Sequence, residues 1–106
     1  MDVNDDSAPT ITHHAQGSGG RYVAAVYGSA EQGYLEWEPG EAQNGQEVRI
    51  AAHTIVPRAI GGRGVAAALV ARLVEDAGRQ GFLIRPDCSY VAARFADNPE
   101  WAAVQA

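Results

Sequence analysis

The sequence of 106 residues contains no lysine, a single cysteine and no apolar run as long as a membrane span. Without lysine it cannot form the Gly-Lys-Ser/Thr phosphate loop of Walker-type nucleotide-binding proteins. The lone Cys88 excludes an intramolecular disulfide framework and a cysteine-rich zinc site. Residues 1–20 also lack the basic start and the apolar centre of a signal peptide. These absences predict a soluble protein of the cytoplasm that does not associate with a membrane.

Basic residues are scarce, because eight stand against 13 acidic residues and the net charge is −5. A general nucleic-acid binder needs a basic patch that collects phosphates, so the sequence argues against this class. Residues 58–94 are the exception, since they carry six arginines and three acidic residues. That segment has the charge to bind a small polyanion, although exposed arginines need no special explanation.

The length suits one domain, and 46% hydrophobic residues are enough for a globular core. Residues 1–19 are polar and lead into a Gly-Ser-Gly-Gly run, so we expect a flexible tail followed by a single domain over 20–106. His13 and His14 lie in this tail. Two adjacent histidines without further converging ligands do not make a metal site, and we expect no metal.

Alternation and β-forming residues predict three strands, over 21–29, 34–38 and 46–56, joined by turns at 31–33 and 39–45. The short connections indicate an antiparallel meander with one wet face. Within the third strand, strict alternation puts Val48, Ile50, Ala52 and Thr54 on one face and His53 on the other.

Apolar residues at helical spacing predict a long helix from Val65 to about 78–81, with Gly81 as its C-terminal cap. A short strand over 82–85, a second helix over 90–96 and a last helical turn over 100–104 follow. The third and fourth strands should be parallel, because a right-handed crossover joins them. The predicted fold is therefore α/β (α+β), a mixed sheet in the order β-β-β-α-β-α with helices packed on it.

A glycine-rich loop lies between the third strand and the long helix. The first N–H groups of a helix have no internal partner, and the helix dipole adds positive charge there. Gly61, Gly62 and Gly64 would allow a phosphate to approach these groups, and Arg58 and Arg63 add charge. The alternative is a turn that merely starts a helix.

A dinucleotide fingerprint, G-x-G-x-x-A, is formally present over residues 62–67, and Asp87 follows at a suitable distance. Five residues separate the fingerprint from its strand, however, and only 19 residues remain after Asp87. They are too few for the further parallel strands that such a fold needs. We interpret this match as a coincidence.

Four stretches resemble the small GNAT-type N-acetyltransferases of the Yjdj-like group: HTIVP (53–57), GGRGVA (61–66), ALV (68–70) and PDCSYV (86–91). The resemblance extends over about residues 21–104. It implies a minimal GNAT-like fold, acetyl-CoA as co-substrate and an amine as acceptor. The chain lacks the N-terminal helices that usually help to build the acceptor pocket, so that pocket should be open or depend on a partner.

The resemblance also implies the residues that bind acetyl-CoA. Backbone groups of Thr54, Ile55 and Val56 should pair with the pantetheine arm like an added strand. The loop from Gly61, with the N–H groups of Gly62, Arg63, Gly64, Val65 and Ala66, should hold the pyrophosphate. One departure is Ala59, which stands where the superfamily usually has Gln or Arg; Arg58 is one residue away.

Acetyl transfer to an amine needs a group that takes a proton, donors for the oxyanion and stabilisation of the leaving thiolate. Cys88 precedes a helix whose dipole lowers a thiol pKa, so it could accept the acetyl group, line the thioester channel or simply pack. His53 could be the base or a structural strand residue. Tyr90 could protonate the thiolate, as tyrosines do in the superfamily, or pack on the second helix.

The sequence therefore predicts an acetyl-CoA-binding N-acetyltransferase with direct transfer to an amine. Glu36 and Glu38 on the wet face could attract a cationic amine, such as a polyamine or a lysine side chain, or be plain surface. The alternative function is a non-catalytic module that binds CoA or acyl-CoA, or that serves as an interaction domain. The sequence names neither the acceptor nor the oligomeric state.

Overall fold

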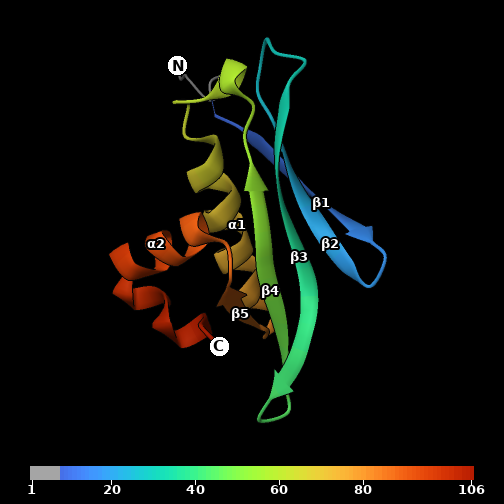
Figure 1. Cartoon of the computed structure of the whole chain (residues 1–106), viewed down its shortest axis with the longest axis vertical. Coiled ribbons are helices and arrows are strands. Elements are labelled where there is room, and N and C mark those ends of the chain that lie inside the picture. Colours follow the sequence, from blue (N-terminus) through green and yellow to red (C-terminus); the bar gives the residue numbers. More distant parts are fainter. Residues whose placement is uncertain (1–7) are drawn as a thin grey trace.

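The computed structural model describes residues 8–106, and its centre is one five-stranded sheet (Figure 1). The strands follow one another across the sheet in sequence order: β1 (Thr10–Gln16), β2 (Gly19–Ala25), β3 (Gln32–Gln43), β4 (Gln46–Ile55) and β5 (Leu83–Pro86). The first four are antiparallel, and β5 is parallel to β4. The mixed sheet and the parallel crossover confirm the predicted fold class.

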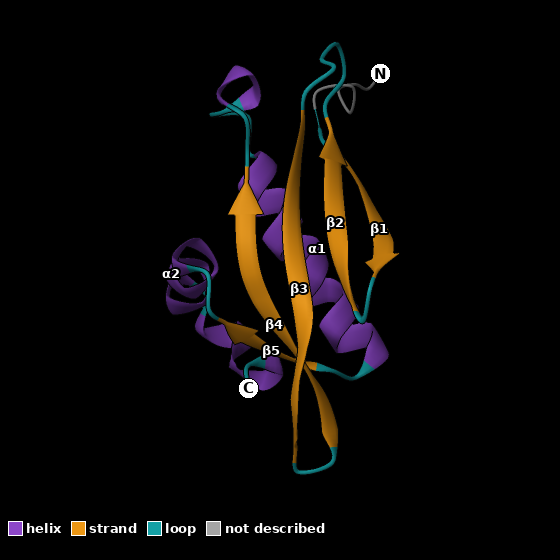
Figure 2. Ribbon diagram, turned by 45° about the vertical axis from the view of Figure 1, so that its right-hand side comes forward, coloured by secondary structure: helices purple, strands orange, loops and turns teal. Residues whose placement is uncertain are grey.

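Two helices and two 3-10 segments complete the fold: α1 (Val65–Gln80), α2 (Ser89–Asp97), η2 (Arg58–Ile60) and η3 (Pro99–Val104). Figure 2 shows α1 behind the sheet and α2 beside the β4–β5 edge. Among the described residues, no helix covers the other face of the sheet, which we call the open face. In the same part of the chain, no helix is long and apolar enough to cross a membrane.

Helix α1 forms as the periodicity predicts. Its apolar stripe is buried against the sheet, with Leu69, Val70 and Leu73 fully enclosed. Gly81 ends the helix in the left-handed conformation (φ 83°) and donates its N–H to the carbonyl of Ala77, the C-terminal cap that the sequence predicts. The core that this stripe builds also holds Tyr22, Leu35, Trp37, Phe82, Ile84, Val91 and Phe95.

Trp101 on η3 closes the core at the C-terminal side. Its ring lies edge-on to Phe95, with centroids 5.4 Å apart and planes at 71°. It is half-buried and packs against the core, so it anchors the C-terminal segment to the rest of the fold.

The expectation of a flexible tail over 1–19 is wrong for Thr10–Gln16, which form β1. This strand pairs with β2 over seven residues, from Thr10 opposite Ala25 to Gln16 opposite Gly19. Its side chains are mostly exposed, and Ile11 is its one apolar side chain that packs against the core, so its composition resembles that of a loop. Residues 1–7 of the predicted tail lie outside the described residues.

The turn expected over 39–45 is much shorter in the structure. Strand β3 continues through Pro39 to Gln43, and the chain reverses at Asn44 and Gly45, which both have positive φ. Pairing of β3 with β2 ends at Trp37, so Pro39 has a strand neighbour on one side only. Proline is tolerated at such an edge position, where its missing N–H breaks no ladder.

A β-bulge at Ala52 interrupts the alternation of β4. Glu36 lies opposite His53, whereas the next residue, Trp37, lies opposite Ala51, so Ala52 is the extra residue. Before the bulge, Ala51 faces the core; after it, Thr54 is on the side of Cys88, which also packs against the core. The single-parity face predicted for Val48, Ile50, Ala52 and Thr54 is therefore wrong.

A buried polar cluster joins α1 to the sheet. Asp76, 2% exposed, accepts hydrogen bonds from the Tyr22 hydroxyl (2.7 Å), Arg79 (2.6 Å) and Arg72 (3.2 Å). Burial alone would raise the pKa of Asp76, but these three donors outweigh it and the pKa lies below its usual value. Asp76 stands three residues after Leu73, at the spacing of the buried face of α1, which explains how a charged residue comes to lie inside the fold.

Candidate functional site

The glycine loop adopts a conformation that its glycines make possible. Gly62 and Gly64 have φ of 74° and 75°, in the left-handed region that residues other than glycine rarely adopt. Gly64 is the N-cap of α1, and the first helical bond runs from the N–H of Ala68 to its carbonyl. The N–H groups of Val65, Ala66 and Ala67 therefore have no partner within the helix. No side chain in the described part of the chain caps this end, and no acidic residue lies in the first turn of the helix, so this end can receive an anion.

A pocket of about 300 Å³ lies at this helix end. It brings together three parts of the chain that are distant in sequence: the residue after β4, the glycine loop with the start of α1, and α2. Its lining consists of Val56, Gly61, Gly62, Gly64, Val65, Ala66, Ala67 and Tyr90. Most of the residues predicted to bind acetyl-CoA thus surround one hollow.

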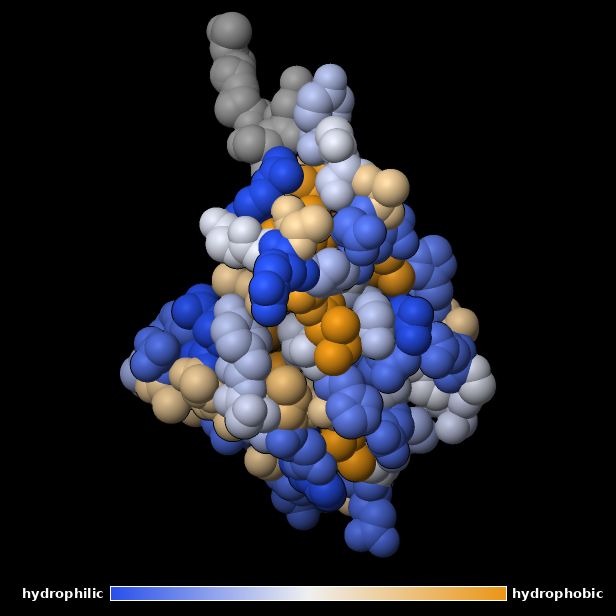
Figure 3. All heavy atoms as spheres, turned by 45° about the horizontal axis from the view of Figure 1, so that its top comes forward, coloured by the Kyte–Doolittle hydropathy of each residue, from blue (hydrophilic) through white to orange (hydrophobic). Residues whose placement is uncertain are grey.

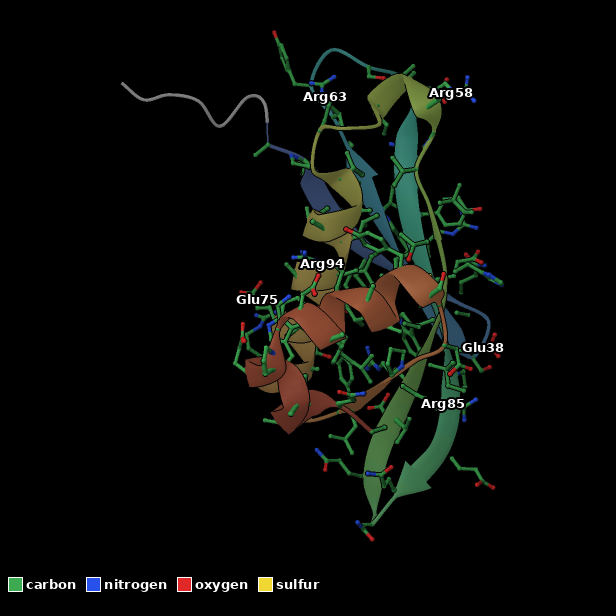
Figure 4. All side chains as sticks on the ribbon, turned by 60° about the vertical axis from the view of Figure 1, so that its left-hand side comes forward. Glu38, Arg58, Arg63, Glu75, Arg85 and Arg94 are labelled. Atoms are coloured by element: carbon green, nitrogen blue, oxygen red, sulfur yellow. The ribbon has the colours of Figure 1, made fainter. Side chains whose placement is uncertain are left out.

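Arg58 and Arg63 flank the loop as two exposed cations. Figure 4 shows both at the loop end of the molecule, on either side of the chain that leads into α1. Neither forms a salt bridge with another described residue. Seen from this end, the surface mixes strongly hydrophilic atoms with small separate apolar areas (Figure 3). The charge and polarity of this end suit a phosphate-containing ligand.

Strands β4 and β5 separate just below the pocket. Their parallel pairing ends at Ala51 opposite Pro86, and a last bond runs from the N–H of Cys88 to the carbonyl of Ala51 (2.9 Å). Beyond this point β4 continues to Ile55, while the other chain turns into α2 (Figure 2). The edge of β4 from Ala52 onward therefore has no strand on this side. An extended ligand can pair with such an edge as an added strand does.

Cys88 lies where the two strands part. It is the N-cap of α2 and half-buried, and its Sγ lies 3.6 Å from the Thr54 hydroxyl, at the limit of a sulfur hydrogen bond. Burial would raise the pKa of the thiol, but the N–H of Val91 and the Thr54 hydroxyl outweigh burial, and the pKa lies below its usual value. A thiol held in this way has an enlarged thiolate fraction near neutral pH.

His53 is placed on the open face rather than beside Cys88. It is exposed and lies opposite Glu36 in the β3–β4 register, whereas its neighbour Thr54 is the residue that contacts Cys88. It lines a small hollow of about 160 Å³ together with Gln16, Gly20, Glu36, Trp37, Glu38 and Ala52. His53 and Cys88, two of the predicted catalytic residues, therefore lie in different surroundings.

The two glutamates of this hollow differ in their partners. Glu36 forms a salt bridge with Arg21, and the hydrogen bond from Arg21 holds the pKa of Glu36 below its usual range. Glu38 has no salt bridge within the described part of the chain and is exposed on the sheet, away from Arg58 and Arg63 (Figure 4). Its nearest labelled cation in Figure 4 is Arg85, whose pKa Glu38 helps to raise although the two form no salt bridge, so Glu38 can still accept a hydrogen bond from a ligand.

Tyr90 lies at the glycine-loop end of the site. It lines the pocket with Val56 and the loop and packs against the core, whereas Cys88 is not among the lining residues. Ile55, at the end of β4, is unusually exposed for a large apolar residue. Among residues 8–106, no three His, Cys, Asp or Glu side chains gather as metal ligands would.

Comparison with known proteins agrees with this geometry. No curated protein matches the chain. The model of one protein family, described as GCN5-related N-acetyl-transferase, matches residues 21–104, from β2 through η3. The match includes the glycine loop, the free edge of β4 and Cys88, and it covers far more than half of the chain. The chain therefore belongs to the GCN5-related N-acetyltransferase family.

Proposed function

We propose that this protein transfers the acetyl group of acetyl-CoA to an amine, and that within its family it belongs to the Yjdj-like group. The observation that carries the proposal is the pocket in which Val56, the glycine loop and the start of α1 meet Tyr90. It offers unpaired N–H groups to a pyrophosphate and opens toward the free edge of β4. The motifs around His53 and Cys88 support the finer assignment.

The phosphates of CoA would bind at the start of α1. The N–H groups of Val65 and Ala66 and the backbone of the glycine loop would donate to the pyrophosphate, and Arg58 and Arg63 would add charge. The pantetheine arm would then run along the backbone of Thr54–Val56, where β4 has no neighbouring strand. This path leads from the pocket to Cys88 and brings the thioester to the point where β4 and β5 separate.

In the transfer step, the amine nitrogen attacks the carbonyl carbon of the thioester, and the carbon–sulfur bond breaks to release the CoA thiolate. A backbone N–H near Ile55 or Val56 stabilises the oxyanion. Thr54 and Cys88 line the thioester end of the channel. Transfer is direct in this proposal, so Cys88 orients the thioester and does not carry the acetyl group.

The acceptor would approach from the open face of the sheet. The opposite face is filled by α1 and the core, whereas His53 and Glu38 line a hollow on the open side that shares Ala52 with the free edge of β4. Glu38 would attract a cationic amine, and His53 would take its proton, since imidazole exchanges protons near neutral pH. A polyamine or a lysine side chain fits this chemistry.

Two variants separate the proposed roles of the side chains. His53→Ala should lower kcat for amines that are protonated at neutral pH, with less effect when the reaction is run at a pH where the amine is already neutral. Cys88→Ala should leave the rate within about threefold if transfer is direct, because no step passes through the thiol. A trapped acetyl group on Cys88, seen by mass spectrometry of the intact protein, would refute direct transfer.

The second candidate function is a CoA-binding module without catalysis. The separation of His53 from Cys88 favours it, because the two predicted catalytic side chains do not act on one another. Such a module would be stabilised by CoA and acetyl-CoA alike and would acetylate no amine in a broad panel. An interaction domain with a degenerate loop would respond to neither compound.

The decisive test is thermal unfolding with acetyl-CoA, with CoA, and with NADH as control. A ligand at about 100 times its Kd adds about 2.7 kcal/mol, which raises the midpoint of a domain of this size by roughly 10 °C or more. A shift with acetyl-CoA but not with NADH is the expected result, followed by amine acetylation measured through release of the CoA thiol. A higher unfolding midpoint with NADH alone would show that the dinucleotide fingerprint binds a dinucleotide. An unchanged midpoint with every compound would overturn the proposal.

A further inference from the structure

Outside its pairing with β2, strand β1 is attached to the rest of the protein by few contacts. Its backbone pairs with β2 over seven residues, and its outer edge has no strand neighbour in the described sheet. On the side of α1, Ile11 packs against the core, and the carbonyl of Ile11 accepts a hydrogen bond from Arg72 of α1 (3.1 Å). Any further contact of β1 with the core therefore has a large share in holding it.

His13 makes the other contact. Its Nε2 accepts a hydrogen bond from the indole N–H of Trp37 (3.0 Å), and its ring stacks on Trp37 and against Tyr22, with centroids 5.9 and 4.5 Å apart. A Cβ at Gly20 would come within 2.6 Å of both Nε2 of His13 and Nε1 of Trp37. Gly20 thus leaves the space in which this bond forms, and the His13 ring covers the nearly buried Trp37.

The hydrogen bond requires a neutral imidazole. Because Nε2 accepts, the ring proton must be on Nδ1, and an imidazolium has no acceptor left for the indole N–H. The ring is exposed on its other side, so a proton can reach it from solvent. Protonation would place two N–H groups against each other at 3.0 Å and force the ring away from Trp37.

Charged groups on each neighbouring element act on His13. Arg49 of β4 and Arg72 of α1 repel an imidazolium, as does His14 when protonated, whereas Asp76 of α1 attracts it. Asp76 already accepts from Tyr22, Arg72 and Arg79, so little of its charge is unpaired. Burial and the nearby Arg49 guanidinium lower the pKa of His13.

We propose that β1 is a pH-released strap: protonation of His13 breaks its bond to Trp37 and frees Thr10–Gln16 from the sheet, while α1 and β2–β5 stay folded. Release uncovers Trp37 and removes Gln16, which is one wall of the hollow on the open face. The inference does not depend on the proposed acetyl transfer. It concerns a conformational change that would act on whatever occupies that hollow.

The direction of the pH dependence follows from proton binding. The strapped state binds fewer protons at His13 than the released state, so low pH favours release. The strap is fully held at a pH above the usual histidine value of about 6.5 and loosens as the pH falls below it. One proton changes the ratio of strapped to released protein by at most about tenfold per pH unit.

Amide hydrogen exchange, followed by NMR on the full chain at about pH 7.5 and about pH 5.0, tests this proposal. After correction for intrinsic rates, protection in β1 should fall several-fold at the lower pH, while protection in α1 stays unchanged. The resonance of the Trp37 indole N–H should titrate together with the His13 ring. Equal loss of protection in α1 and β1 would mean global unfolding and would overturn the strap, as would unchanged protection in β1.

His13→Gln and His14→Gln are the matched variants. Glutamine at position 13 has an amide oxygen that accepts the indole N–H and gains no proton in this range, so β1 should stay protected at both pH values. His14 bonds only with Thr12 on its own strand, and its replacement should leave the pH response intact. Loss of β1 protection at low pH in the His13 variant would contradict the proposal. Should that variant not fold, the indole titration in the unaltered protein decides alone.

Discussion

The polar groups at the two ends of α1 differ in whether they have hydrogen-bond partners. In its C-terminal half, Asp76 is buried and receives three hydrogen bonds, so both of its oxygens are satisfied. At its N-terminus, the N–H groups after Gly64 have no capping side chain among residues 8–106, and the first turn of the helix contains no acidic residue. A satisfied cluster fastens the helix to the sheet, whereas a helix end with free donors is prepared for a ligand. The comparison separates polar residues that stabilise the fold from those available for function.

Removal of Asp76 should have the largest effect on stability. Asp76→Ala leaves the buried Tyr22 hydroxyl without an acceptor and Arg72 and Arg79 without their shared partner, and it should lower the free energy of unfolding by about 3 kcal/mol. Chemical denaturation measures the loss. The matched control is Asp87→Ala on the exposed pair with Arg85, for which we expect no measurable loss of stability.

Asp76 also determines the direction in which the stability of the fold changes at acidic pH. The pKa of Asp76 is lower in the folded chain than in the unfolded one, so its contribution is present above the usual value of about 4 and is lost as the pH falls further. Asp76→Asn should therefore flatten the fall in stability at acidic pH. If stability falls just as steeply at acidic pH in this variant, other carboxylates govern acid unfolding.

Alteration of the helix start should act on ligand binding more than on stability. Gly64→Ala puts a side chain at φ 75° and shifts the donors of Val65 and Ala66, so acetyl-CoA should bind at least about tenfold more weakly, with a loss of stability of about 1 kcal/mol. Calorimetric titration measures the affinity. Gly78→Ala, an exposed position within α1 with open space around it, should instead stabilise the helix by about 0.5–1 kcal/mol and leave binding unchanged.

The smallest effect is expected at the Cys88 thiol, at the point where β4 and β5 separate. Thr54→Val removes the hydroxyl that helps to lower the pKa of Cys88, so the pKa should rise and alkylation by iodoacetamide near neutral pH should slow by about two- to threefold. The dependence of the alkylation rate on pH gives the pKa directly. An unchanged profile would assign the low pKa to the backbone donors at the start of α2 alone.

Much of the fold was predictable because its signals are local. The stripe of Leu69, Val70 and Leu73 and the cap at Gly81 define α1 within one stretch of chain. The right-handed crossover then makes β4 and β5 parallel, without knowledge of the packing. Strand β1 was not predicted because a polar, exposed edge strand has the composition of a loop. Its pairing with β2 identifies it as a strand.

The sequence indicates the end of the candidate site at which phosphate would bind, but not the arrangement at the end where acetyl transfer would occur. Gly62 and Gly64 stand between a strand and a helix, and this order alone indicates an anion site. Whether His53 and Cys88 meet depends on the bulge at Ala52, which changes the face of every residue after it and leaves no mark in the alternation. The glycine loop could be placed from the sequence, but the grouping of His53 and Cys88 could not.

Local signals define the glycine loop that follows a strand and opens a long helix, since glycine conformation and helical periodicity depend on neighbouring residues. Which polar groups are satisfied depends instead on tertiary contacts. Asp76 meets the Tyr22 hydroxyl from 54 residues away, and Trp37 meets His13 from 24 residues away. Hydrogen bonds over such separations require the folded sheet to bring both partners within about 3 Å, and no local pattern encodes that distance.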